Sequence, residues 1–259
     1  MNMNKFLQLA LRASQKSADI LIKKYQKFNR HDIQLKSRHE ILTENDLLSE
    51  KIIIKEIKKQ FPEHSIFSEE KGQDNQKSDY LWLIDPIDGT TNFSIHNPFW
   101  AISIALAYKN EIIMGLVYAP ILKEKFTAVK NKGAYLNNKK IKVSDIKNGK
   151  IINAFCHGNK IKDIKRAIKY YQKQKLNHLD CRQLGSAALE LSYVASGRIE
   201  SIAIPGVNPY DVGAGVLIVR EAGGKITDFK GNKWNLKSRD ILVSNKKVHN
   251  ILLKNLKNI

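Results

Sequence analysis

The sequence has few cysteines and no long apolar run, and both shortages narrow the kind of protein it can be. Only two of its 259 residues are cysteines, Cys156 and Cys181. Two cysteines give neither a disulfide framework nor the paired spacing of a zinc site. The longest plainly apolar run, 101–108, is far shorter than the roughly 18 residues that a membrane span needs. We therefore expect reduced thiols and no membrane-spanning segment.

The N-terminal residues also lack the continuous apolar core of a secretory signal. Lys5, Gln8, Arg12 and Gln15 interrupt their apolar positions, which is not typical of a signal peptide. The chain shows no long linker, low-complexity segment or internal repeat. Hydrophobic residues make up 42% of it and charged residues 27%, values typical of a globular protein. We expect a cytoplasmic protein with a sizeable core.

Acidic residues are scarce relative to basic ones. The chain has 25 Asp and Glu against 44 Lys and Arg, a formal net charge of +19. Such an excess raises the question of nucleic-acid binding, but the lysines are spread along nearly the whole chain instead of forming one stripe. The densest cluster, 160–175, is interpreted as the solvated face of a helix in preference to an RNA-binding patch. The positive field would also attract phosphorylated molecules.

The first half of the chain changes from helical to strand-like periodicity. Apolar residues recur at helical spacing over 4–28, and a second helix is expected to follow Thr43 and to end at Phe61 and Pro62. Strands joined by short polar turns come next and predict an antiparallel meander that the early helices cover. These strands are expected at 101–108, 112–118, 125–130 and 134–137.

The second half alternates between strands and helices. We expect strands at 151–156, 198–204 and 241–244, helices at 161–174, 186–195 and 210–222, and a last helix at the C-terminus. Sheets with helical layers between and around them are the economical architecture for such a chain.

The most informative segment is 82–93, which reads Trp-Leu-Ile-Asp-Pro-Ile-Asp-Gly-Thr-Thr-Asn-Phe. The residues before Asp85 suit a buried strand, Pro86 should block its continuation, and Gly89 allows a tight turn. Asp85 and Asp88 then fall at the carboxyl end of the strand. The residues after Gly89 can open a helix whose free amides point at an anion. Acids beside anion-binding amides suggest a bridging cation.

For other acidic residues, the local sequence alone does not decide between a structural role and a role in the site. Glu69 and Glu70 follow a short apolar segment, so one of them is expected to reach the site. Asp211 lies in the first turn of an expected helix, where an aspartate is more often a cap than a ligand. Asp46 follows Thr43 with the spacing of a capping box, and both a capping and a functional interpretation stay open.

Together these segments resemble the inositol monophosphatase family of magnesium-dependent phosphatases. The resemblance covers nearly the whole chain and implies a layered α-β-α-β-α sandwich, of mixed α+β and α/β class, in a homodimer. It implies one domain, 1–259, with helices and a metal-bearing meander in 1–150 and an alternating half in 151–259. The matching segments are 43–46, 68–70, 85–92, 133–138, 185–188, 210–215 and 220–224.

Carried over residue by residue, the resemblance assigns a site with two or three Mg²⁺ ions. Glu69, Asp85 and the carbonyl oxygen of Ile87 would hold a first metal, and Asp85, Asp88 and Asp211 a second. Carboxylates within about 4 Å repel one another by roughly 1 to 4 kcal/mol per pair, so converging acids need cations or protons. Oxygen donors without Cys or His select magnesium over zinc.

The same resemblance assigns the groups around the metals. Thr90 and Asp46 resemble the pair that orients and deprotonates the attacking water. Lys36 corresponds to a lysine near the metals, with a solvated lysine as the alternative. The expected substrate contacts are Asp88, Gly89, Thr90 and Thr91 on the phosphate side and Gly185, Ser186 and Ala187 beside the alcohol.

The implied function is Mg²⁺-dependent hydrolysis of a phosphate monoester, like that of an inositol-1-phosphate phosphatase, by direct attack of a metal-activated water. Ile204 stands seven residues before Asp211, where inositol-preferring relatives carry a glutamate, and Tyr210 replaces their usual tryptophan. Histidinol phosphate, sugar phosphates and 3′-nucleotides therefore stay open as substrates. An RNA-binding or transcription-complex protein on the same fold is the alternative from a different class.

Overall fold

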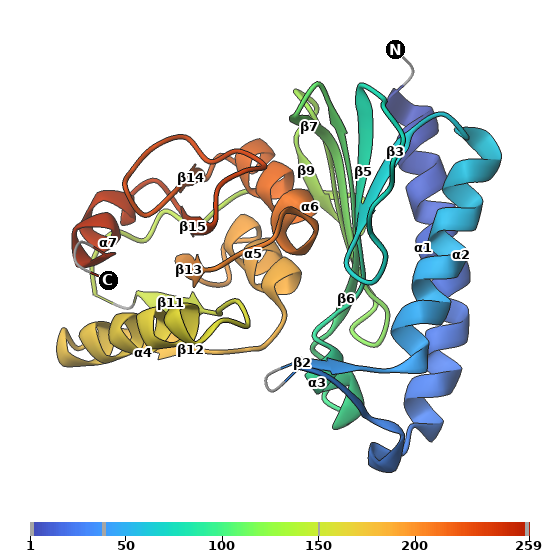
Figure 1. Cartoon of the computed structure of the whole chain (residues 1–259). Coiled ribbons are helices and arrows are strands. Elements are labelled where there is room, and N and C mark those ends of the chain that lie inside the picture. The colour runs from blue at the N-terminus through green and yellow to red at the C-terminus, as the bar shows by residue number, and fades with distance from the viewer. Residues whose placement is uncertain (1–2, 38–39, 150, 257–258) are drawn as a thin grey trace.

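Two long N-terminal helices cover one face of a large sheet. The computed structural model describes residues 3–37, 40–149, 151–256 and 259. Helices α1 (Met3–Lys27) and α2 (Glu44–Gln60) run side by side along that sheet (Figure 1). Both helices confirm their predicted ranges, since Thr43 is the N-cap of α2 and Phe61 its C-cap. Between them lie a short helix, η1 (Arg30–Asp32), and the hairpin β1 (Gln34–Ser37) and β2 (Glu40–Leu42), which the sequence patterns did not indicate.

The large sheet contains the predicted meander and extends it on both sides. Its strand order is β10-β9-β8-β7-β6-β5-β3-β4. The four strands β6 to β9 pair antiparallel as expected, whereas β3 pairs parallel to β5. The strands are β3 (Ser65–Ser68), β4 (Gly72–Gln73), β5 (Tyr80–Asp88), β6 (Ala101–Tyr108), β7 (Glu111–Ala119), β8 (Glu124–Val129), β9 (Ala134–Leu136) and β10 (Lys139–Ile141).

The expectation that Pro86 stops its strand is wrong. Strand β5 continues to Asp88, and its register against β6 shifts between the Asp85–Ser103 and Asp88–Ala101 pairs. Pro86 therefore lies in a bulge. Because residues in a bulge are not paired with the neighbouring strand, the missing N–H of proline costs no hydrogen bond between the strands. Consequently both aspartates lie inside the end of a buried strand, with only 3% and 8% of their surface exposed.

A five-stranded sheet and four helices, α4 to α7, form the second half of the fold. Its order is β12-β11-β13-β15-β14, with β11 parallel to both of its neighbours. The predicted elements correspond to β11 (Ile152–Phe155), α4 (Ile161–Leu176), α5 (Ala187–Ala195), β13 (Ser201–Pro205), α6 (Pro209–Glu221), β15 (Asp240–Ser244) and α7 (His249–Leu256). The strands β12 (Asp180–Arg182) and β14 (Lys225–Thr227) were not expected.

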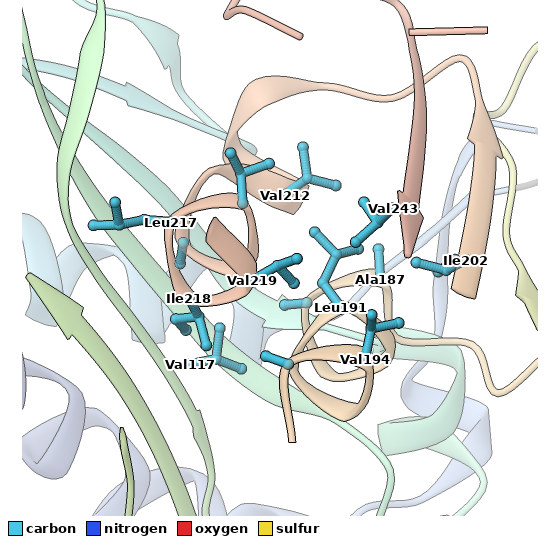
Figure 2. Close-up of a cluster of buried hydrophobic side chains, with 14 of the residues drawn as sticks. Val117, Ala187, Leu191, Val194, Ile202, Val212, Leu217, Ile218, Val219 and Val243 are labelled. Atoms are coloured by element: carbon cyan, nitrogen blue, oxygen red, sulfur yellow. The ribbon is translucent and has the colours of Figure 1, made fainter. Parts of the chain in front are cut away.

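The elements stack in the predicted α-β-α-β-α order. Helices α5 and α6 lie between the two sheets, and α4 and α7 lie against the smaller sheet (Figure 1). The middle layer is the centre of the larger apolar core, to which Leu191, Val194, Val212, Leu217 and Ile218 contribute (Figure 2).

Small residues let this middle layer pack closely. A Cβ built on Gly115 of β7 would lie 2.7 Å from the carbonyl oxygen of Ala214, and one on Gly215 of α6 would lie 2.6 Å from the Cβ of Leu191. Glycine is required at both positions because real Cβ atoms do not approach other atoms so closely. Helix α6, which carries Asp211, is thereby held against both β7 and α5.

The described residues include no disulfide bond and no helix suited to spanning a membrane. Neither Cys156 nor Cys181 forms a disulfide bond. None of the helices in the described ranges is long and apolar enough to cross a membrane.

The buried His249 makes the fold sensitive to acid. Its Nδ1 lies 2.7 Å from the hydroxyl of Ser244 and its Nε2 lies 3.0 Å from the hydroxyl of Thr227. Burial, with a smaller effect of the Lys225 charge, lowers the pKa of His249 from 6.5 to about 4. Between these two pH values the unfolded chain binds a proton that the folded chain does not, so stability is lost as the pH falls.

We predict that acidification from pH 6.5 to about 4 removes up to about 3 kcal/mol of unfolding free energy through His249. Urea unfolding of the wild type and of His249→Gln at several pH values measures this contribution, because glutamine does not titrate. The exposed His31→Gln is the control and should follow the wild type. Equal pH dependence in the wild type and His249→Gln would show that this residue is not responsible.

Candidate active site

One cavity collects most of the residues that the sequence singled out. It measures about 420 Å³ and lies where β5, α3 (Thr90–Ser94), α5 and α6 meet. A larger cavity of about 640 Å³, between α1 and η1, contains none of the predicted site residues. The predicted residues that line the smaller cavity are Glu69, Asp85, Ile87, Asp88, Gly89, Thr90, Thr91, Gly185, Ala187 and Asp211.

Asp85 experiences the charges of all three other acidic residues of the cavity. Burial raises its pKa well above the usual value, and the negative charges of Glu69, Asp88 and Asp211 raise it further. A side-chain hydrogen bond with Glu69 acts in the same direction. The backbone N–H of Ile87 donates to Asp85 Oδ1 at 3.1 Å. Four carboxyl groups from three segments of the chain are therefore close enough for three of them to raise the pKa of the fourth.

Asp88 joins β5 to the start of α5. Its carboxylate accepts the hydroxyl proton of Ser186 and the amide protons of Ala187 and Ala188, the latter two at 3.1 and 2.7 Å. Burial raises the pKa of Asp88 to about 6, although these donors lower it. Ser186 is also the N-cap of α5. Asp88 thus holds in place Ser186 and Ala187, two of the residues expected beside the alcohol of the substrate.

Asp211 caps its helix and also lines the cavity. It lies in the first turn of α6, where its Oδ2 accepts the N–H of Asn208 at 2.9 Å in a capping interaction. It also lines the cavity. The neighbouring Tyr210 packs edge-on against Phe67 at a centroid distance of 5.2 Å. Capping and participation in the site are therefore compatible.

Asp46 also caps a helix, and it binds Thr90, a residue that lines the cavity. Its Oδ2 accepts the N–H and the hydroxyl of Thr43 at 2.8 and 2.6 Å, which completes the capping box of α2. Its Oδ1 accepts the hydroxyl of Thr90 at 3.0 Å, and that hydroxyl also lies 3.0 Å from the carbonyl oxygen of Ile87. Burial raises the pKa of Asp46 to about 6 against the lowering effect of these bonds.

The turn at Gly89 is possible only for glycine. Its φ is +100°, and a Cβ there would meet the carbonyl oxygens of Gly185 and Phe99, each at 3.1 Å. The expected lysine, Lys36, belongs to β1, but its side chain lies outside the described part of the structure.

Comparison with known proteins decides the family. The sequence matches the inositol monophosphatase family over residues 2–259. The chain belongs to this family.

Relatives of the chain carry two kinds of name. Nus factor SuhB of Pasteurella multocida is 39% identical over 252 residues, which cover 93% of this chain and 92% of that protein. The extragenic suppressor protein suhB of Bartonella henselae has a TM-score of 0.90 at 30% identity, covering 98% of this chain and 99% of the other. The inositol monophosphatase of Anabaena has a TM-score of 0.87 at 32% identity, covering 100% and 98%.

The donor set fits the hard cation on which this family generally depends. Glu69, Asp85, Asp88, Asp211 and the carbonyl of Ile87 are oxygen donors around one cavity, and oxygen donors suit Mg²⁺. Within the described ranges, however, no three His, Cys, Asp or Glu side chains are already grouped to hold a metal ion. The carboxylates share a cavity without forming a closed ligand set. The assignment of individual ligands to this inositol monophosphatase homologue remains a prediction.

Several residues of the site escaped the sequence analysis. Asn92 of α3 donates through Nδ2 to the carbonyl oxygens of Phe99 and Leu184 at 2.7 and 2.8 Å and so ties α3 to the loop before α5. The buried Glu190 accepts the N–H of Leu184 at 2.8 Å. Only the position of Asn92, directly after the double-acid motif, could have indicated it. The outer wall of the cavity adds Cys156, His157, Gly158, Asn159, Gln183 and Asn208.

Proposed function

We propose that the protein is a Mg²⁺-dependent phosphate monoester hydrolase that uses direct attack of water on phosphorus. The observation that supports this function most strongly is the convergence of Glu69, Asp85, Asp88 and Asp211, from three segments of the chain, on one cavity. The hydrogen-bonded pair of Thr90 and Asp46 lies at the same place. A structural cation site would not need a general base beside it. We also propose that the protein is a homodimer, as the family resemblance implies, and that it is cytoplasmic.

The chain's own groups suggest how the reaction proceeds. Two or three Mg²⁺ ions, held by the four carboxylates and the Ile87 carbonyl, would neutralise the phosphate and acidify a bound water. Thr90 can accept the proton of the attacking water as it passes its own proton to Asp46. A pKa of about 6 suits Asp46 to act as a base near neutral pH. The amides of Gly89, Thr90 and Thr91 would bind phosphate oxygens.

We predict that Asp85→Asn lowers Mg²⁺-dependent phosphate release by at least about 1,000-fold, because it removes the ligand shared by both metals. The same change should raise the thermal midpoint of the metal-free protein, since it relieves the repulsion among the buried acids. Asp79→Asn is the control, because Asp79 is an exposed residue near Lys109. Phosphate release by Asp85→Asn near the wild-type rate would contradict the proposed function.

The wall of the cavity favours an uncharged, polar alcohol as the leaving group. Asn159, Gln183, Asn208 and His157 offer amide and imidazole groups there, while Ile204 offers none. Among the described residues, no Lys or Arg lines this cavity to pair with a second phosphate. No carboxylate besides the four acids lines it to bind an ammonium group. We therefore place inositol 1-phosphate or a similar sugar alcohol phosphate ahead of the other candidates.

A phosphate-release panel tests this preference. We predict a kcat/KM at least about tenfold higher for inositol 1-phosphate than for fructose 1,6-bisphosphate, histidinol phosphate or a 3′-phosphonucleotide, because charged groups would find no partner in the wall. Gln183→Leu should reduce this preference by removing an amide from the wall. A preference for the bisphosphate or for histidinol phosphate would refute the assigned substrate class.

A second function, binding to RNA or to a transcription complex, is favoured by two observations. Relatives of this chain are named Nus factor SuhB, and the net charge of +19 suits a nucleic-acid partner. This function would use the basic surface instead of the acidic cavity.

Salt dependence tests the second function. If it holds, a labelled single-stranded RNA binds at about 50 mM salt and loses at least about tenfold in affinity at about 300 mM, because binding releases counterions. Asp85→Asn should bind the RNA as the wild type does. Fluorescence anisotropy measures both proteins. No binding at the lower salt concentration would exclude RNA as a partner.

A further inference from the structure

One face of α2 contacts two different segments of the candidate active site. Asp46, Ser49 and Glu50 occupy positions i, i+3 and i+4 of this helix, so their side chains lie on the same face. All three are polar, and their exposed fractions are 1%, 0% and 0%. Burial of three consecutive polar positions on a helix face costs free energy unless each finds partners.

The first two residues of this face have partners within the double-acid segment. Asp46 binds the hydroxyl of Thr90. Ser49 donates its hydroxyl to the carbonyl oxygen of Pro86 at 3.0 Å, inside the bulge of β5, and also lies 2.7 Å from the hydroxyl of Ser17. The helix therefore supports the segment on both sides of Asp88.

The third residue, Glu50, binds a different segment. Its Oε2 accepts the backbone N–H groups of Glu70 and Lys71 at 3.0 and 3.4 Å. The preceding N–H, that of Glu69, is bound by the carbonyl oxygen of Ile84 at 3.1 Å. Three successive amides of the turn after β3 are thus fixed, two of them by one carboxylate. This turn carries Glu69 into the cavity.

Packing does not explain a glutamate at position 50. Its Oε1 is buried and has no hydrogen-bond partner among the described residues, so half of the carboxylate is desolvated without compensation. An apolar residue of the same size would avoid that cost but could not bind the two amides. Glu50 itself does not line the cavity. Its contribution must therefore act through the turn.

We propose that Glu50 is a positioning residue, which holds the 69–71 turn so that Glu69 is aimed into the cavity as a ligand for a divalent cation. This inference rests on the proposed function, because it assumes that the cavity binds a metal. Groups that orient metal ligands typically affect metal affinity by 10- to 100-fold. The effect should fall on metal binding and leave the Thr90 and Asp46 pair intact.

Two variants separate the length of the side chain at position 50 from its charge, and a third is a control. Glu50→Asp keeps the negative charge but shortens the side chain, so it cannot reach the amides of Glu70 and Lys71. Glu50→Gln loses the charge but keeps an oxygen acceptor at the same reach. Glu56→Gln is the control on the same helix, because Glu56 lies near the surface and pairs with Lys16 and Arg12.

Binding of Mn²⁺ alone, followed by electron paramagnetic resonance, measures the effect without turnover. We expect Glu50→Asp to weaken Mn²⁺ binding at least about tenfold, while Glu50→Gln and Glu56→Gln stay within about threefold of the wild type. In phosphate release, Glu50→Asp should raise the Mg²⁺ concentration for half-maximal rate by a similar factor with kcat at saturating Mg²⁺ little changed. A purely structural role would lower the thermal midpoint without this split.

Each remaining outcome decides a different question. Wild-type Mn²⁺ affinity in Glu50→Asp would overturn the positioning role. An equal loss of Mn²⁺ affinity in Glu50→Asp and Glu50→Gln would also overturn it. Glutamine keeps an oxygen acceptor that reaches the two amides, so the positioning role predicts little loss in Glu50→Gln. If the wild type binds no Mn²⁺, the proposed function fails before the role of Glu50 is addressed.

Discussion

The structure depends on keeping like charges together at one buried point. Glu69, Asp85, Asp88 and Asp211 line a single cavity, and burial and mutual repulsion raise the pKa of Asp85 well above its usual value. The fold opposes this repulsion with donors. Asp88 receives a hydroxyl and two amides at the start of α5, and Asp211 receives an amide at the start of α6. Charges concentrated in this way are suited to holding cations.

The same donors connect the two halves of the fold. Helices α5 and α6 form the apolar middle layer, and their first turns also form the wall of the cavity. Their N-terminal ends carry the unsatisfied amides that favour nearby carboxylates. Asn92 adds a direct link from α3 to the loop before α5. Stability of the core and geometry of the site therefore depend on the same two helices.

Much of this arrangement was predictable because it depends on local patterns. Helical spacing located α1 and α2, alternation and turn residues located the meander, and the double-acid motif identified the end of β5. The bulge at Pro86 was missed because proline normally stops a strand, and only pairing with β6 shows that the ladder shifts there. The unexpected strands β12 and β14 are three residues each, too short to produce a periodic signal.

The sequence by itself determined which residues are chemically able to act: the acids, the glycine at position 89, and the family to which their order and spacing belong. Only the tertiary structure decided that the helix-capping Asp211 also lines the cavity, that the helix-capping Asp46 also binds Thr90 of the cavity, that Asp88 binds α5, and that Glu50 binds the turn beside Glu69. The physical reason is that capping is a local contact between residues three apart. The other contacts join segments that are adjacent only after the sheets and helices have packed.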